Sequence, residues 1–341
     1  MAKFTDKDPL MVSIRCLTYN HEKYIRQTLD GFVMQKTNFR FEAVVHDDAS
    51  TDGTAEIIRE YAEKYPDIIK PIYETENQYS KHDGSLQNLM NAACKGKYTA
   101  WCEGDDWWSD PLKLQKQYDV MEAHPECSIC VHKVACTNED GSPNERVIPD
   151  DVYGLKPGVQ NKEELARIMW NYLFQTSSYF MRRTVLDYAT EHFDLLRSYN
   201  GDVRMMRSAF CLGAYYYIDE PMSVRRLGSI NGWNDRQRTL PLKKRLSWLD
   251  SQTEADFLFS DYLGGQYTET IRRHWVRAVL FWSMRNPRWA KRWLVKHGVL
   301  WSDTVGLRKM FKIYYILLMH FYPLFCLWSL LKKLKAKCSR K

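Results

Sequence analysis

The chain has 341 residues, of which 45% are apolar and 27% charged, a composition that is ordinary for a globular protein and excludes a disordered or fibrous one. This length allows one large α/β domain with an appendage. The net charge is only +7, but residues 272–341 hold 17 lysines and arginines and a single acid, Asp303, so the tail is strongly basic.

The N-terminal residues do not form a signal peptide pattern, and nine scattered cysteines favour a reducing cytosol over a disulfide framework. Cys127 and Cys130 form a C-x-x-C, with Cys136, His124 and His132 nearby. A zinc site would need four converging ligands. We favour a buried strand over residues 127–136, because free cysteine packs as a small apolar residue.

Residues 11–123 alternate short apolar runs with amphipathic segments. The pattern predicts strands over 11–17, 41–45, 68–73 and 98–102, and helices over 22–34, 55–64, 86–94 and 112–123. Such alternation with short connections indicates a parallel, doubly wound α/β sheet. After residue 140 the alternation weakens, and we expect a strand over 174–183, a helix over 202–213, and strands over 215–218 and 222–226.

Polar clusters follow three of these strands, at residues 18–20, 47–54 and 103–106. Ligands of such sheets bind at the carboxyl ends of the strands. The three clusters therefore locate a binding site at that edge of the sheet.

The run WCEGDDWW at 101–108 places Glu103, Asp105 and Asp106 around Gly104. Crowded carboxylates repel one another unless a cation neutralises them, and Mg²⁺ or Mn²⁺ is commonly held by one or two carboxylates plus substrate phosphates. The alternative is a solvated acidic turn before a helix that begins near residue 111.

Asp47 and Asp48 end the second predicted strand and open the turn at 50–54. A carboxylate at a strand end can accept hydrogen bonds from a base or a ribose. Asp52 or Thr54 can instead cap the following helix. We expect both roles, on different residues of this turn.

Three motifs occur in order: a strand ending in TYN at 18–20, a strand ending in DDASTDGT at 47–54, and GKYTAWCEGDDWW at 96–108. Together they resemble the family-2 glycosyltransferases, especially bacterial enzymes that build capsular or lipopolysaccharide glycans. The resemblance is strong over residues 10–135 and weak over 170–235. It implies an α/β fold of the GT-A type, Rossmann-like and typical of nucleotide-diphospho-sugar transferases, with a mainly helical, basic C-terminal extension.

The resemblance also implies a donor site in which Tyr19 stacks on the nucleotide base. The residues expected to bind the nucleotide sugar are Thr18, Tyr19, Asn20, Asp47, Asp48, Asp105, Trp107 and Arg226. Asp105 and Asp106 would hold the metal, Mn²⁺ or Mg²⁺. Glu103 stands where many relatives carry the first acid of the metal motif, a departure that keeps the charge.

The stretch Asn200-Gly201-Asp202 resembles the family's acid pair that opens a helix, which implies that Asp202 is the catalytic base of an inverting transfer. Such a base deprotonates the attacking hydroxyl. Capping of its own helix is the other role open to Asp202. Residues 223–229 lack the histidine of the family's Y-R-x-H but keep Arg226, which can pair with phosphate through two nitrogens.

We therefore expect a catalytic domain over 1–240, with a nucleotide-sugar half at 10–135 and an acceptor half at 136–240. Its expected function is inverting transfer of a hexose or N-acetylhexosamine, from a UDP-sugar, to a hydroxyl of a growing lipid-linked surface glycan. The alternative is a non-catalytic nucleotide-sugar-binding protein on the same fold. Nucleic acid is not an expected partner, because the tail is too apolar to track phosphates.

The remaining residues, 241–341, are expected to form a helical, basic and aromatic tail that associates with a membrane. Residues 313–331 are apolar, long enough to span a bilayer of about 30 Å. Upstream, Trp282, Trp289 and Trp293 alternate with basic residues, a pattern suited to anionic headgroups. We expect peripheral or monotopic attachment at the cytoplasmic face of the inner membrane. A true crossing and a tail folded onto the catalytic domain are the alternatives.

Overall fold

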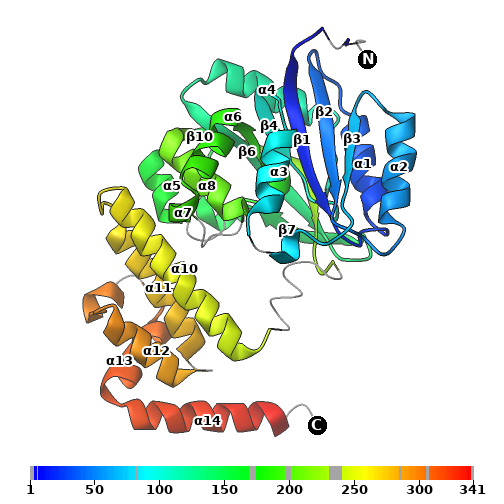
Figure 1. Cartoon of the computed structure of the whole chain (residues 1–341). Helices are drawn as coiled ribbons and strands as arrows, with labels where there is room; N and C mark the ends of the chain where they lie inside the picture. The colour runs from blue at the N-terminus through cyan, green and yellow to red at the C-terminus, as the bar shows by residue number, and fades with distance from the viewer. Residues whose placement is uncertain are drawn as a thin grey trace. The chain divides into compact units, whose positions relative to one another are not determined.

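The computed structural model describes residues 4–5, 7–81, 83–168, 174–196, 201–229, 240–283, 286–304 and 307–338 (Figure 1). The chain divides into two compact units, Met1–Leu240 and Pro241–Lys341. The first is an α/β unit and the second is helical.

One sheet runs through the first unit. Its strands are β1 (Leu10–Thr18), β2 (Arg40–Asp47), β3 (Ile69–Tyr73), β4 (Tyr98–Trp101), β5 (Trp107–Trp108), β6 (Cys127–Thr137), β7 (Pro143–Ile148), β8 (Gly158–Gln160), β9 (Phe180–Arg182) and β10 (Ala214–Arg226). Their order is β3-β2-β1-β4-β9-β6-β10-β5, with β7 on β6 and β8 on β10. Strands β1 to β4 are parallel, and so are β6 and β10.

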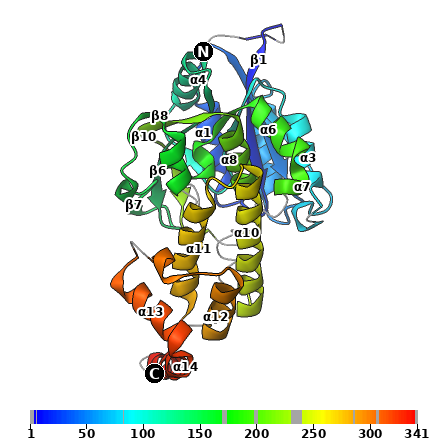
Figure 2. The ribbon, with the colours of Figure 1, turned by 90° about the vertical axis from the view of Figure 1, so that its left-hand side faces the viewer.

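Helices cover both faces of this sheet (Figure 2). They are α1 (Ile25–Val33), α2 (Thr54–Lys64), α3 (Ser85–Ala93), α4 (Lys113–Ala123), α5 (Lys162–Ile168), α6 (Arg183–Glu191), α7 (Phe193–Leu196) and α8 (Gly201–Leu212), with 3₁₀ turns at Tyr79–Lys81, Asp151–Tyr153 and Thr176–Ser178. Leu29, Ile58 and Leu114, from α1, α2 and α4, share a core with Ile14 of β1. Successive strand side chains point to opposite sides of the sheet, so apolar side chains also lie on the opposite face. That face packs on α3.

The sheet differs from the prediction in its second half. Strand β9 runs antiparallel to both β4 and β6, so the sheet is mixed rather than wholly parallel. Residues 174–183 form a 3₁₀ turn and β9 instead of one long strand. Strand β10 is continuous where two strands were predicted, and its register shifts on either side of Pro221, which has no N–H to donate to the ladder. The strand predicted over 127–136 is confirmed as β6.

The second unit contains only helices and turns among its described residues. The helices are α10 (Leu242–Tyr262), α11 (Thr268–Ser283), α12 (Pro287–Lys296), α13 (Lys309–His320) and α14 (Tyr322–Cys338), with a 3₁₀ turn at Trp301–Thr304. Trp289 and Trp293 are buried, and the Trp289 indole donates a hydrogen bond of 3.0 Å to Asp250. The headgroup contact expected of these two side chains is therefore wrong.

The apolar run at 313–331 does not form one helix. Helix α13 ends at His320, and α14 begins at Tyr322, directly before Pro323, which is well tolerated only in the first turn of a helix. Over the described ranges, no helix combines the length and the apolar character needed to cross a bilayer.

Candidate functional site

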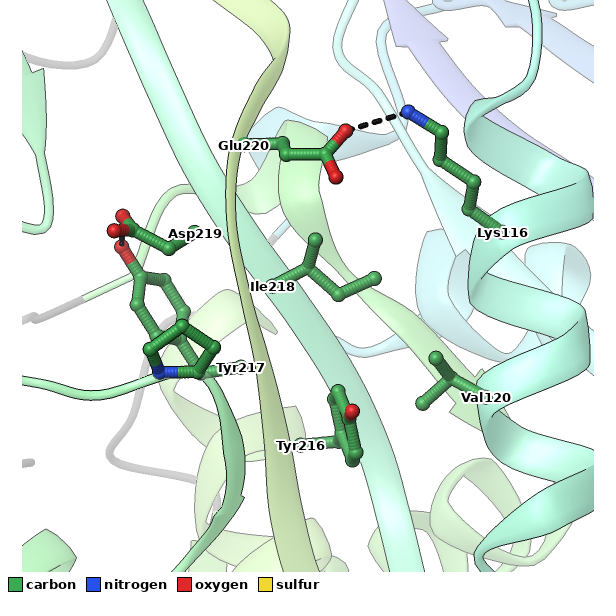
Figure 3. Close-up of a pocket in the computed structure, with 8 residues that line it drawn as sticks. Lys116, Val120, Tyr216, Tyr217, Ile218, Asp219 and Glu220 are labelled. Atoms are coloured by element: carbon green, nitrogen blue, oxygen red, sulfur yellow. Dashed lines mark hydrogen bonds and ion pairs between the residues drawn. The ribbon is translucent and has the colours of Figure 1, made fainter.

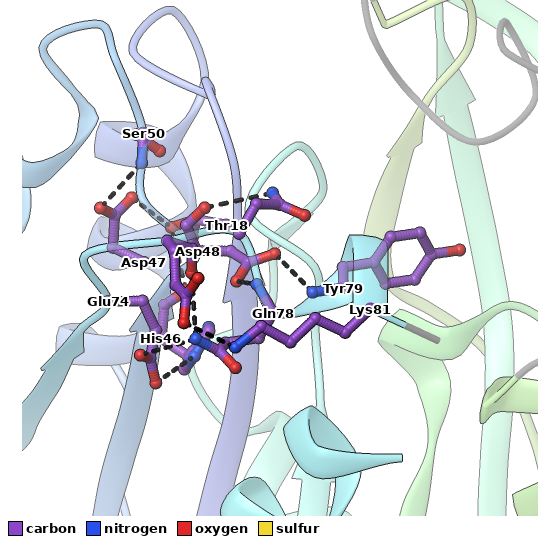
Figure 4. Close-up of polar contacts among 11 residues, drawn as sticks. Thr18, His46, Asp47, Asp48, Ser50, Glu74, Gln78, Tyr79 and Lys81 are labelled. Carbon is purple, nitrogen blue, oxygen red and sulfur yellow. Dashed lines mark hydrogen bonds and ion pairs between the residues drawn. The ribbon is translucent and has the colours of Figure 1, made fainter. Parts of the chain in front are cut away.

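The carboxyl ends of β1 and β2 meet at one edge of the sheet, because Thr18 and Asp47 are register partners. The Thr18 hydroxyl donates to the His46 carbonyl at 3.1 Å, and lies 3.3 Å from an Asp47 carboxylate oxygen (Figure 4). Burial lowers the pKa of His46, which therefore stays neutral beneath this edge. The first two polar clusters of the sequence are thus brought together.

Asp48 is only 4% exposed, and both of its carboxylate oxygens accept backbone N–H groups (Figure 4). The donors are Gln78, at 2.6 Å, and Tyr79, at 3.0 Å. Asp48 thereby ties the loop after β3 to the end of β2.

Asn20 and Ala49 have positive φ angles of 56° and 60°. Such angles are uncommon for residues other than glycine, and they cluster where a loop must present particular groups. Asn20 holds its conformation through a hydrogen bond from its N–H to Ser50 and one that its side chain accepts from the Thr51 N–H. The loops after β1 and β2 are therefore locked together, with half-buried Tyr19 between Thr18 and Asn20.

Burial alternates from residue to residue along the acidic motif, as it does along a strand. Glu103, Asp105 and Trp107 are half-buried, whereas Asp106 and Trp108 are only 3% and 1% exposed. A Cβ at Gly104 would lie 2.6 Å from the Thr18 methyl carbon, so only glycine lets the motif approach the end of β1 so closely.

Asp105 and Asp106 differ sharply in their partners. The Asp106 carboxylate accepts hydrogen bonds on both oxygens, from the Arg226 backbone N–H and the Gln175 amide, each at 2.9 Å. Asp105 accepts one from the Ser229 hydroxyl, at 2.7 Å. Of the two neighbours, Asp105 has the more accessible carboxylate.

Arg226 lies between two aromatic rings. Its guanidinium carbon is 4.7 Å from the centre of the Tyr24 ring and 4.9 Å from that of the Trp107 ring. Its terminal nitrogens donate to Gln27, at 2.8 Å, and to the Glu139 carbonyl, at 2.9 Å. Arg226 therefore fastens β10 to α1 and to the acidic motif, and both terminal nitrogens already have a protein acceptor.

Arg225, the preceding residue of β10, is half-buried and differs in its contacts. Within the described residues its guanidinium makes no hydrogen bond or ion pair. Its positive charge nevertheless opposes the rise in the pKa of both Asp106 and Asp202. Arg225 thus supplies a positive charge within electrostatic reach of these two carboxylates, and no other described residue pairs with it.

The acids of the site repel one another. Burial raises the pKa of Asp106 to about 8, and the charge of Asp105 adds to the effect. Burial also raises the pKa of Glu103 to about 7; Arg15 opposes this rise, whereas Asp105 and Asp202 add to it. The pKa of Asp202 is raised by burial and lowered in part by the Val203 N–H, which donates to it at 2.8 Å.

These acids suit a hard divalent cation in their chemistry, because they are oxygen ligands whose charges a cation would neutralise. Among the described residues, however, no three histidine, cysteine or acidic side chains are grouped closely enough to hold a metal by themselves. An ion at Asp105 would need further oxygen ligands from outside these side chains to complete its coordination.

For three side chains of this network, no role was predicted from the sequence. Arg15 is buried in β1, stacked 4.1 Å from the Trp101 ring and 3.9 Å from a Glu103 oxygen. Gln175 and Ser229 hold the two aspartates. The position of Arg15 inside the apolar run VSIRCL could have indicated a buried, paired charge. The contacts of Gln175 and Ser229 depend on long-range packing and had no such signal.

A separate hollow of about 390 Å³ lies between α4 and the middle of β10 (Figure 3). Lys116 and Glu220 form an ion pair of 2.5 Å at its edge, and none of the predicted site residues lines it. It is therefore distinct from the site at the strand ends.

The model of the family "Glycosyl transferase family 2" matches residues 13–189, which is more than half of the chain. The chain belongs to glycosyltransferase family 2. Its fold is the GT-A fold, shared with S. aureus TarS, whose structure in complex with UDP-GlcNAc superposes with a TM-score of 0.62 over 92% of each chain at 17% identity. Both conclusions confirm the expectation from the three sequence motifs.

Sequence relatives match only part of this glycosyltransferase. The uncharacterized protein Rv1520 of Mycobacterium tuberculosis is 45% identical over 138 residues, which are 40% of this chain and 39% of that protein. The putative teichuronic acid biosynthesis glycosyltransferase TuaG of Bacillus subtilis is 30% identical over 40% of this chain and 52% of its own. The Escherichia coli enzyme WfaP, a UDP-Glc:α-D-GlcNAc-diphosphoundecaprenol β-1,3-glucosyltransferase, is 31% identical over 33% of this chain and 41% of its own. The chain thus spans about two fifths to one half of these relatives.

Proposed function

We propose that this chain transfers a sugar from a nucleoside-diphosphate sugar to an acceptor hydroxyl with inversion, and that Asp202 is the catalytic base. The observation that carries the proposal is a carboxylate with a raised pKa at the start of α8, within electrostatic reach of the acidic motif. A base whose pKa lies closer to neutrality matches its task better than an ordinary aspartate.

In the proposed reaction the Asp202 carboxylate accepts the proton of the acceptor hydroxyl. The hydroxyl oxygen forms a bond to the anomeric carbon as the bond from that carbon to the diphosphate oxygen breaks. The nucleoside diphosphate leaves with the bonding electrons. Attack from the face opposite the leaving group inverts the anomeric centre.

Donor binding is assigned to the edge formed by β1, β2 and the acidic motif. Thr18, Tyr19 and Asn20 would border the nucleotide, together with the loop that Asp47 and Asp48 support. TarS binds UDP-GlcNAc on the same fold, which supports a UDP-sugar as the donor.

The diphosphate is assigned to the face of the motif that carries Asp105. A Mn²⁺ or Mg²⁺ ion bound there would supply positive charge to the leaving group. Arg225 can approach the phosphates directly because its guanidinium is unpaired within the described part of the chain. Asp106 and Arg226 would not contact the phosphates but would hold β10 in position. Trp107 would lie between Arg226 and the sugar.

The acceptor is proposed to be a lipid-linked glycan at the cytoplasmic face of the inner membrane. The name of WfaP gives an undecaprenol-linked sugar as the acceptor of that relative, and TuaG is named for teichuronic acid biosynthesis. The strongly basic tail of this chain fits the same surroundings.

The direct test is a donor panel. Purified full-length protein is mixed with UDP-, GDP- and dTDP-sugars in Mn²⁺, and release of free nucleoside diphosphate is followed by mass spectrometry. Turnover of one UDP-sugar is expected. Binding of a donor without any hydrolysis or transfer, with and without lipid-linked acceptors, would instead indicate a nucleotide-sugar-binding protein.

A further inference from the structure

The solvent-exposed surface of α13 and α14 carries several large apolar side chains. Six side chains on it are between 43% and 60% exposed, and most follow one another at helical spacing: Met310, Ile313, Phe321, Leu324, Leu327 and Leu330. We call these six residues the outer surface. Outward positions of a helix on a water-soluble unit are normally polar, so the outer surface needs an explanation.

The inner sides of the same two helices already form a core. Phe311 and Leu318 of α13 are 7% and 0% exposed, and Phe325 of α14 is fully buried. The rings of Tyr314, Phe325 and Trp328 lie 5.5 to 5.8 Å apart and join the helices to each other. The outer surface is therefore not needed to hold the pair together.

The charge around the outer surface has one sign. Residues 307–341 contain nine lysines and arginines and no acid. Arg308 and Lys309 are exposed at the start of α13, and four lysines follow Leu330 within the span of α14. A second copy of this chain would bring the same positive charge, whereas an anionic bilayer supplies both an apolar interior and negative headgroups.

We propose that α13 and α14 dock on a bilayer that contains anionic phospholipids, with the outer surface inserted among the acyl chains and the basic residues at headgroup level. The proposal deepens the proposed membrane attachment by naming the face that makes it. It does not depend on a particular donor or acceptor sugar.

The test is sedimentation of the full-length protein with vesicles at low salt. One set contains phosphatidylcholine alone, and the other adds phosphatidylglycerol. The wild type should sediment with the anionic vesicles. The double variant Leu324→Glu/Leu327→Glu should lower the partition coefficient at least about tenfold, because two exposed leucines would no longer enter the bilayer.

A matched control places the same two changes elsewhere. Leu212→Glu/Leu258→Glu alters leucines that are 43% and 60% exposed on α8 and α10, and it should bind vesicles as the wild type does. Melting temperatures and donor hydrolysis in solution should be equal in all three proteins. Absence of hydrolysis in the wild type would count against the proposed transferase and leave the vesicle result standing.

Three outcomes would overturn the assignment of the outer surface to anionic membranes. They are equal binding by the wild type and the Leu324→Glu/Leu327→Glu variant, equal binding to neutral and anionic vesicles, and a dimer in light scattering that the variant abolishes while no vesicle binds. The last outcome would identify a second copy as the occupant.

Discussion

Helix α1 in the first unit and α13 in the second are built on the same periodicity but differ on their outer sides. In α1 the buried Leu29 and Phe32 face the sheet, and charged Arg26 and Asp30 face solvent. In α13 the buried Phe311 and Leu318 also face a core, but the outward side carries Met310, Ile313 and Ile316. The apolar side of α1 is buried within its own unit. Helix α13 buries one apolar side in the same way but exposes further apolar side chains to solvent.

The two units also differ in where their charged residues lie. The first unit encloses acids and arginines around its site, where burial raises the pKa of Glu103 and Asp106. The second unit carries its surplus of basic residues toward the chain end. In our proposal the two units therefore bind different partners: a compact polyanion with its metal at the first, and an extended anionic surface at the second.

Among the changes within the donor site, the largest expected effect is at Asp105. Asp105→Asn should lower transfer by about 10²–10³-fold, because a carboxylate ligand of the ion that would neutralise the leaving diphosphate is lost. Its melting temperature should stay at the wild-type value, since Asp105 is half-buried and accepts one hydrogen bond. Steady-state kinetics over a Mn²⁺ titration measures the loss. The control is Asp67→Asn, at an exposed acid, and wild-type turnover in Asp105→Asn would remove the metal assignment.

A substitution of Arg226 tests whether this residue holds β10 in position or contacts the donor. Arg226→Gln should lower the free energy of unfolding by about 2–4 kcal/mol, because two hydrogen bonds and two ring contacts are lost from a buried group. Urea denaturation measures the change. An unchanged midpoint, together with weaker binding of UDP, would show that Arg226 contacts the donor instead.

Arg225→Gln should have the reverse signature. Stability should fall by less than in Arg226→Gln, since the guanidinium makes no hydrogen bond or ion pair in the described ranges. The Kd for UDP should rise about tenfold, as expected when a charged hydrogen bond to phosphate is lost. The Kd for uridine, which has no phosphate, should stay the same. Calorimetry with both ligands distinguishes contact with the diphosphate from contact with the base.

Much of the site could be predicted because it lies at strand ends. The short apolar runs locate β1, β2 and β4, and polar clusters directly follow them, so Thr18, Asp47 and the acidic motif were expected at the same edge of the sheet. The different roles of Asp105 and Asp106 were not predictable. They depend on Gln175 and Arg226, which lie 69 and 120 residues from Asp106 in sequence. The interruption of the 313–331 run at Phe321 likewise had only the weak signal of Pro323.

A further expected effect is on the pH dependence of stability. The folded-state pKa values of Glu103, about 7, and Asp106, about 8, lie above the value near 4 of unfolded carboxyls. The folded protein therefore binds these protons more tightly, and their contribution is complete below about pH 4 and lost as the pH rises through about 7 to 8. In metal-free buffer Asp106→Asn should flatten this decline, as measured by melting temperature. Parallel curves for the two proteins would contradict the raised pKa of Asp106.

The most direct test of the proposed transfer is the variant Asp202→Asn, assayed for donor binding by calorimetry and for transfer with the donor found by the panel. Asparagine keeps the oxygen that accepts the Val203 N–H but cannot take a proton. If Asp202 is the base, the Kd for the donor should be unchanged while transfer falls by about 10²–10⁴-fold. Equal losses of binding and transfer, or transfer at the wild-type rate, would contradict that role.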